Sequence, residues 1–138
     1  MKRRCPAEER DGLKEEIRGF FSCRPEIYTV YLHGSFLSNP EFNDIDLAVC
    51  VDQSGLGPLD YELNLEVVLQ EHFGYPFDVR ILNMGPVSFA YRVIKEGDRI
   101  YVKDDDKRAT FEEEILTRYL DFLYYHKQFM VEGYGIRL

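Results

Sequence analysis

The chain has 138 residues, with 17 Lys and Arg against 25 Asp and Glu, so its net charge at neutral pH is −8. This length predicts one domain that can bury a hydrophobic core, and a hydrophobic fraction of 45% is typical of a folded protein. The charge argues against a protein that holds nucleic acid by neutralising phosphates, because its own field repels the polyanion. Metal cations and basic protein surfaces are the partner classes that an acidic chain favours.

Cysteine usage and the N-terminus indicate the compartment. The three cysteines, Cys5, Cys23 and Cys50, form no CxxC pair, so their spacing predicts neither a disulfide framework nor a zinc site. The basic residues at the start precede no apolar core, which argues against a secretory signal peptide. No apolar run approaches the roughly 20 residues of a membrane span. We therefore expect a cytoplasmic protein without a membrane partner.

The first half of the chain predicts one helix followed by two strands. Apolar residues recur at helical spacing over 7–21, and an Arg-Pro pair ends that helix. Beta-branched and aromatic residues predict strands over 27–32 and 45–51. Gly34 ends the first of these strands, and residues 39–43 form a loop before the second.

Helices and strands alternate in the second half. A helix is predicted over 58–73, with a proline at its first position and Gly74 as the left-handed residue after its end. Strands are predicted over 76–82 and 99–103, and a short helix over 86–97 lies between them, closed by a glycine.

A long amphipathic helix follows. Thr110 and Glu113 form a capping-box pattern, which predicts that the helix starts near Thr110, within a span of about 107–130. The acidic run 104–106 is interpreted as a solvated loop. We expect most of the aromatic stripe of this helix to be core, while its outer aromatic residues are a candidate partner surface. The stripe comprises Phe111, Ile115, Tyr119, Phe122, Leu123 and His126.

The order of these elements defines the expected fold class. The connection between the first two strands is too short for a crossover helix, so we expect them to be antiparallel neighbours. A long helix joins the second strand to the third, which predicts a parallel pair. The chain is therefore expected to be a single α/β (α+β) domain over 1–138, with its core at about 13–103 and a mixed four- to five-stranded sheet flanked by helices.

Two carboxylates lie at the start of the second predicted strand. Asp44 and Asp46 bracket Ile45, and because side chains alternate along a strand, both carboxylates point to one face. Two such groups about 6.5–7 Å apart repel each other unless a cation lies between them. Mg²⁺ prefers oxygen ligands and keeps phosphate oxygens in its shell, which suits this pattern.

Two further features complete a candidate site. Gly34 and Ser35 follow the first strand, where a close backbone approach, turn amides and a hydroxyl can hold phosphate oxygens. Asp78 lies in the third strand, and it completes a three-carboxylate cluster if that strand is the neighbour of the second. A phosphate-binding turn opposite two metal ions is typical of enzymes that catalyse phosphoryl or nucleotidyl transfer. Asp78 is a candidate general base for such a reaction.

Simpler interpretations exist for several of these residues. Asp44 can cap a loop, Asp46 can be an exposed edge residue, and Asp78 can form a salt bridge with Arg80 on the same strand face. His33, which precedes the glycine, is interpreted as a packed or partly exposed strand residue rather than a catalytic group.

The combination of Gly34-Ser35, Asp44-x-Asp46 and Asp78 resembles the nucleotidyltransferase superfamily of the DNA polymerase β type. The small size resembles its minimal branch, the MNT antitoxins, which are paired with HEPN-type RNase toxins. Parts of the second half, at 93–101, 111–112 and 119–122, look like the C-terminal half of these antitoxins, so the resemblance covers about residues 13–126. It implies a palm-like fold.

The resemblance also implies an activity and residue roles. Such antitoxins use ATP and Mg²⁺, here two ions, to attach AMP to a tyrosine of the HEPN toxin. Asp44, Asp46 and Asp78 would be the catalytic residues and bind the metals, Asp78 would act as the base, and Gly34 and Ser35 would hold the triphosphate. The loop between Ser35 and Asp44 is shorter than is usual in the family, and it lacks the Arg-Gly pair often found there.

Two other functions remain open at this point. A non-catalytic antitoxin would neutralise its partner by binding alone, with a site that decayed when the loop shortened. A nucleotidyltransferase with a small-molecule acceptor, such as an aminoglycoside, would usually need a further substrate-binding domain.

Overall fold

The computed structural model describes residues 3–5, 7–39, 41–52, 55 and 57–134. Its main sheet has four strands in the order β5-β4-β2-β6. Strand β2 pairs antiparallel with β4 and β6, and β4 pairs parallel with β5, so both predicted pairings are confirmed. The strands are β2 (Ile27–His33), β4 (Ile45–Val51), β5 (Phe77–Ile81) and β6 (Asp98–Val102).

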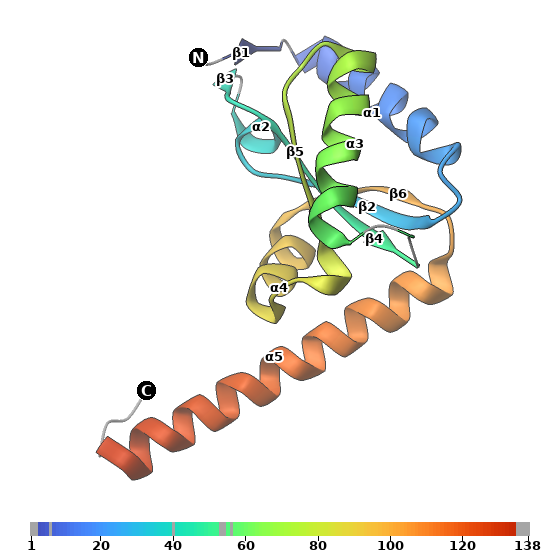
Figure 1. Ribbon diagram of the computed structural model, residues 1–138. Coiled ribbons are helices and arrows are strands. Elements are labelled where there is room, and N and C mark those ends of the chain that lie inside the picture. Colours follow the sequence, from blue (N-terminus) through green and yellow to red (C-terminus); the bar gives the residue numbers. More distant parts are fainter. Residues whose placement is uncertain (1–2, 6, 40, 53–54, 56, 135–138) are drawn as a thin grey trace.

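Helices cover both faces of this sheet (Figure 1). Helices α1 (Ala7–Ser22) and α3 (Pro58–Phe73) lie on one face, and α4 (Val87–Glu96) and α5 (Asp105–Tyr134) lie on the other. The predicted mixed sheet flanked by helices is therefore confirmed. None of the helices in the described ranges is both long and apolar enough to cross a membrane.

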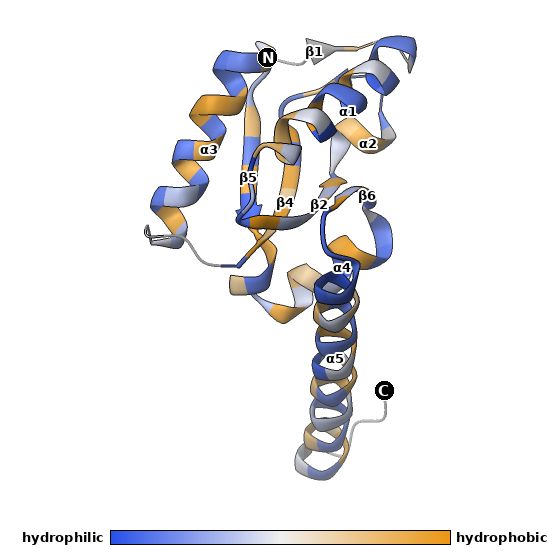
Figure 2. Ribbon diagram, turned by 90° about the vertical axis from the view of Figure 1, so that its right-hand side faces the viewer, coloured by the Kyte–Doolittle hydropathy of each residue, from blue (hydrophilic) through white to orange (hydrophobic). Residues whose placement is uncertain are grey.

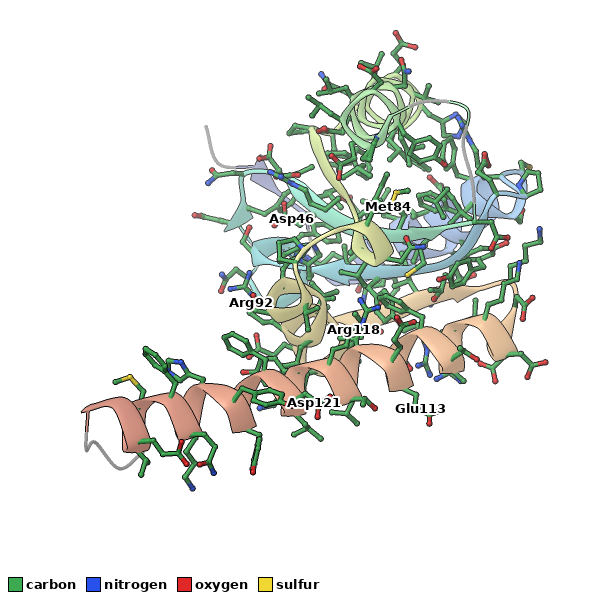
Figure 3. The ribbon with its side chains drawn as sticks, turned by 60° about the horizontal axis from the view of Figure 1, so that its bottom comes forward. Asp46, Met84, Arg92, Glu113, Arg118 and Asp121 are labelled. Atoms are coloured by element: carbon green, nitrogen blue, oxygen red, sulfur yellow. The ribbon has the colours of Figure 1, made fainter. Side chains whose placement is uncertain are left out.

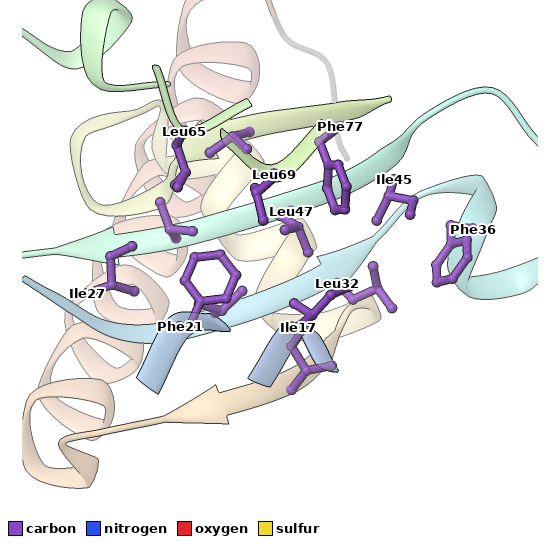
Figure 4. Packing of buried hydrophobic residues seen from close by; sticks show 14 of the residues in the cluster. Ile17, Phe21, Ile27, Leu32, Phe36, Ile45, Leu47, Leu65, Leu69 and Phe77 are labelled. Atoms are coloured by element: carbon purple, nitrogen blue, oxygen red, sulfur yellow. The ribbon is translucent and has the colours of Figure 1, made fainter. Parts of the chain in front are cut away.

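The larger half of the core lies between the sheet and the α1/α3 layer (Figure 4). Leu47 and Val49 of β4 point to this face, as their alternation with the acidic positions predicts, and both are fully buried. Ile17 and Phe21 of α1 and Leu69 of α3 pack onto them. This packing fixes the central strand, whose first residues carry the candidate site.

The other face of the sheet carries a smaller core beneath α4 and α5. Tyr31 and Cys50 pack there with Ala90 of α4 and with Phe111 and Ile115 of α5. Only the first half of α5 takes part, because the helix leaves the body beyond this contact and continues alone (Figure 2). The prediction that most of the aromatic stripe is core is therefore wrong for the second half of the helix, where Phe122 is 57% exposed.

Short elements and one helix boundary differ from the prediction. The connection after Gly34 contains a helical turn, α2 (Ser35–Ser38), and a two-residue strand, β3 (Glu41–Phe42), which pairs with β1 (Arg3–Arg4). Helix α5 begins at Asp105 rather than near Thr110, because the carboxylate of Asp104 accepts the backbone N–H of Lys107 and caps the helix earlier. Two residues of the acidic run thus belong to the first helical turn, where negative charge is favourable.

A partly buried polar network fastens α5 to the sheet. The hydroxyl of Tyr31 donates a hydrogen bond of 2.7 Å to Glu112, which also accepts bonds from Arg99 (3.0 Å) and Arg108 (2.7 Å). These donors lower the pKa of Glu112 even though its partial burial opposes the charged form.

We expect Glu112→Ala to lower the free energy of unfolding by about 2–4 kcal/mol, because two guanidinium groups and the hydroxyl of the buried Tyr31 lose their acceptor. Glu113→Ala, at the exposed neighbouring position, is the control and should change stability by less than about 0.5 kcal/mol. Urea unfolding measures both. Equal effects of the two substitutions would show that the network does not hold the helix.

Candidate functional site

Three polar side chains lie in one row across the ends of three adjacent strands. In the antiparallel β2–β4 pair His33 is opposite Asp46, and in the parallel β4–β5 pair Asp46 is opposite Asp78. Residues directly opposite each other in a sheet point to the same face. The sequence prediction that Asp46 and Asp78 come together on neighbouring strands is therefore borne out by the register. Asp44 stands just before β4 and is exposed.

Gly34 brings the backbone of the next turn against Asp46. Its φ is +78°, a left-handed conformation, and a Cβ atom placed on it would lie 2.0 Å from Oδ2 of Asp46. No side chain fits in that space, so the glycine lets the chain pass directly beside the carboxylate. Ser35 then begins α2, whose turn is closed by the N–H of Asn39 bonded to the carbonyl of Ser35 at 2.8 Å.

The electrostatics of the site centre on Asp46. Burial, followed by the charges of Asp78 and Asp44, raises its pKa from 3.8 to about 6. Asp78 itself forms a salt bridge of 3.0 Å with Arg80 on the same strand face. Asp78 is thus a neighbour of Asp46 in the sheet and also the ion-pair partner of the exposed Arg80, as the simpler interpretation of Asp78 expects.

Two hollows meet at His33 and Asp46. One lies toward α4 and the other toward β5 and the segment before α4. Figure 3 places Asp46 and Arg92 of α4 at the same end of the sheet. The first hollow is further lined by Gly34, Leu37, Arg92, Val93, Glu96 and Gly97, and the second by Glu62, Asp78, Arg80, Ile81, Gly85, Pro86 and Phe89.

Comparison with known proteins now identifies the family. The model of the polymerase beta nucleotidyltransferase family matches residues 15–106, which is more than half of the chain. The chain belongs to the polymerase beta nucleotidyltransferase family. A search among curated proteins finds no significant match.

Solved structures agree with the nucleotidyltransferase fold. A chain of the MntA–HepT toxin–antitoxin crystal structure has a TM-score of 0.66 at 16% identity, and the match covers 91% of this chain and 99% of that one. A chain from the complex of the tri-AMPylated Shewanella oneidensis HEPN toxin with its MNT antitoxin has a TM-score of 0.67 at 17% identity over 92% and 99%. A chain of a toxin–antitoxin structure with AMP-PNP has a TM-score of 0.63 at 18% identity over 95% and 100%.

The nucleotidyltransferase site fits a divalent cation in ligand type and charge. Burial and then the charges of Asp78 and Asp44 raise the pKa of Asp46, and a cation bound there would relieve the repulsion among the three carboxylates. Within the described part of the chain, however, no three His, Cys, Asp or Glu side chains are gathered into a ready metal cage. Asp78 is turned to Arg80 in this conformation, so its carboxylate would have to exchange that partner for a metal.

The connection between Ser35 and Asp44 in this nucleotidyltransferase is held by a residue from another element. Arg10 of α1 donates from Nε to the carbonyl of Cys5 at 3.0 Å, and its two terminal nitrogens donate to the carbonyls of Phe36 and Asn39. Its guanidinium also lies 4.6 Å from the centre of the Phe36 ring. A basic residue that is absent from the loop sequence is thus supplied by α1.

Sequence reasoning missed Arg10 and Arg92. An arginine on an amphipathic helix has no local signal that marks it as a residue that holds a loop, as Arg10 does, or as one that lines the hollow at Asp46, as Arg92 does. His33 packs edge to face on Phe89 with ring centres 5.6 Å apart, and burial lowers its pKa. It is a partly buried strand residue, as predicted, but it also lines both hollows.

Proposed function

We propose that this nucleotidyltransferase is the antitoxin of a toxin–antitoxin pair and transfers AMP from ATP to a tyrosine of a HEPN-type toxin, with Mg²⁺ bound at Asp44, Asp46 and Asp78. The observation that carries the proposal is the contact between Gly34 and Asp46 beside Asp78. This contact places a backbone turn that can bind phosphate beside carboxylates that can bind a metal. The fold is also similar to that of a chain from an MNT–HEPN complex. The AMP-PNP structure of a similar chain further supports a nucleoside triphosphate as substrate.

The reaction assigns a task to each group. The tyrosine oxygen attacks the α-phosphorus of ATP, the new O–P bond forms, and the bond to the β-phosphate oxygen breaks to release pyrophosphate. Asp78 accepts the phenolic proton. The turn at Gly34 and Ser35 holds the triphosphate, and Arg92 faces it from α4 as a positive charge. The metal, when bound, would neutralise charge that develops on the phosphate oxygens.

Labelled ATP provides the direct test. The protein is incubated with Mg²⁺, ATP labelled at the α-phosphate and the HEPN-type product of the neighbouring gene, and the toxin is then mapped by mass spectrometry. We expect AMP on a toxin tyrosine, and none when Asp44→Asn is combined with Asp46→Asn. A wild-type protein that leaves the toxin unlabelled would overturn the enzymatic proposal.

A second candidate is a non-catalytic antitoxin, which the Asp78–Arg80 salt bridge and the short loop favour. It predicts that the Asp44→Asn, Asp46→Asn double variant still suppresses the RNase activity of the toxin as fully as the wild type. Measuring label and RNase activity on the same samples separates the two candidates.

The Arg10 clamp leads to a further prediction. Because Arg10→Met removes three donors to the segments around the phosphate turn, we expect the apparent KM for ATP to rise about tenfold, with a smaller change in kcat. Arg18→Met is the matched control, since Arg18 also lies on α1 and donates to a backbone carbonyl, that of Ile100 in β6. Similar kinetics for the two variants would show that Arg10 only stabilises the fold.

A further inference from the structure

The second half of α5, residues 119–134, extends from the body as a single helix (Figures 1 and 2). We refer to residues 119–134 as the arm. Large apolar side chains on it are in water, since Phe122 is 57% exposed and Leu123 is 42% exposed. Exposed apolar patches of this kind on soluble proteins mark interaction surfaces.

The exposed stripe continues a face of α5 that is already an interface. Phe111 and Ile115 are buried against the body, and Tyr119 stacks on Tyr91 of α4 with ring centres 3.8 Å apart. The same helical face then presents Phe122 and His126, whose rings lie parallel to each other with centres 6.0 Å apart. A partner on the arm would therefore extend the α4–α5 packing without a break.

The arm lies on the side of the molecule where the site opens. In Figure 3 the arm extends from the body on the side where Asp46 and Arg92 are labelled. Helix α4 connects the two regions, because Tyr91 contacts the base of the arm while Phe89 and Arg92 line the hollows at Asp46. A protein seated on the arm would therefore lie on the same side of the molecule as the site.

The spacing of the apolar residues on the arm and the net charge of the chain indicate what kind of partner binds the arm. The stripe repeats every three to four residues, and such a stripe packs best along another helix. A second copy of this chain is disfavoured, because each copy carries a net charge of −8 and two such molecules repel each other as they approach. A basic helical protein meets both requirements.

We propose that the arm is the docking site for the protein acceptor of the nucleotide, and that a helix of the acceptor packs along the stripe at Phe122 and Leu123. The inference rests on the proposed function for the identity of the acceptor. It adds that the acceptor is held by α5, outside the hollows, and is presented to Asp46 across α4.

The test compares two double variants on opposite faces of the arm. Phe122→Ser with Leu123→Ser removes one aromatic and one aliphatic side chain from the stripe. The matched control, Leu120→Ser with Tyr124→Ser, removes the same two classes from the far side, where Leu120 is 55% and Tyr124 60% exposed. Binding to the HEPN-type product of the neighbouring gene is measured by calorimetry, and the KM for the toxin and for ATP by label transfer.

We expect the stripe variant to bind the toxin at least about 30-fold more weakly and to raise the KM for toxin alone, with the KM for ATP unchanged. The control should stay within about threefold of wild type. A conservative variant, Phe122→Leu with Leu123→Met, should restore binding, which shows that loss in the serine variant does not reflect an unfolded arm. Circular dichroism verifies that all three variants keep the helix.

Several outcomes overturn the docking proposal. They are wild-type binding by the stripe variant, equal losses in the stripe and control variants, and wild-type self-association through the stripe that added toxin does not displace. By contrast, arm-dependent binding without any label on the toxin supports docking while the proposed AMP transfer fails. The two inferences are therefore separable in one set of samples.

Discussion

Asp46→Asn is expected to reduce AMP transfer by roughly 10³-fold and, at the same time, to stabilise the metal-free protein at neutral pH. The loss of transfer follows because Asp46 occupies the middle of the row between His33 and Asp78, where the proposed metal is held. The gain in stability follows because its carboxylate is half-buried beside two other carboxylates.

The sign of the pH dependence follows from the pKa of Asp46, which folding raises from 3.8 to about 6. Between these two values the folded chain binds more protons than the unfolded chain, so the free energy of unfolding falls as the pH rises. Above about pH 6 Asp46 is ionised in the folded protein, and the destabilisation caused by its charge is then complete. Discounted for partial exposure, it amounts to about 1–2 kcal/mol, which Asp46→Asn removes at pH 7.5 but not at pH 4.

Urea unfolding at pH 4 and pH 7.5 in EDTA measures this effect, and added Mg²⁺ should then stabilise the wild type more than the variant. Asp121→Asn, on the exposed arm, is the control for removing a carboxylate and should change stability by less than about 0.5 kcal/mol. If Asp46→Asn lowered stability at pH 7.5, or left AMP transfer at the wild-type rate, the assignment of Asp46 would be wrong.

Gly34→Ala is expected to abolish transfer through backbone geometry rather than through charge. A Cβ atom there would meet Oδ2 of Asp46 at 2.0 Å, so either the turn at Gly34 and Ser35 or the carboxylate must move. The control is Gly74→Ala, because Gly74 has nearly the same φ of +77° and has no atom within 4 Å of an added Cβ. Gly74→Ala should therefore cost only the left-handed strain, about 1 kcal/mol.

The excess cost of Gly34→Ala over Gly74→Ala isolates the collision, and we expect it to be about 1–3 kcal/mol in urea unfolding. Combining Gly34→Ala with Asp46→Ala should recover most of that excess, because the second substitution removes the atom that collides. Equal free energies of unfolding for the two glycine variants, with no recovery in the double variant, would show that the close contact between Gly34 and Asp46 does not constrain the structure.

Local sequence pattern was sufficient for the central strand and its carboxylates. Alternation of apolar and acidic residues defined β4 and the face of Asp46, and the helix between β4 and β5 implied the parallel pair that brings Asp78 beside it. The αL conformation of Gly74 was likewise predicted from its place after a helix.

The missed features depend on contacts between distant segments or on competition between similar signals. Arg10 clamps carbonyls that follow it by 26 and 29 residues, which no local pattern reveals. Asp104 and Thr110 are both good helix caps, and the earlier one is used because its carboxylate reaches the N–H of Lys107. Periodicity defined the stripe of α5 but not what covers it, so the exposed half was assigned to the core.

Helix α5 is fixed to the body at one end only, so a small tilt at that end moves its free end by a larger distance. Its first half is fixed at the Glu112 network and at the Tyr91–Tyr119 stack, and the remaining 15 residues to Tyr134 extend over roughly 22 Å. A tilt of about 10° at the fixed half would displace the tip by roughly 4 Å, which exceeds the tolerance of most contacts between helices. Substitutions at Tyr31 or Glu112, which touch neither the site nor the arm, would thus alter where an acceptor stands relative to Asp46.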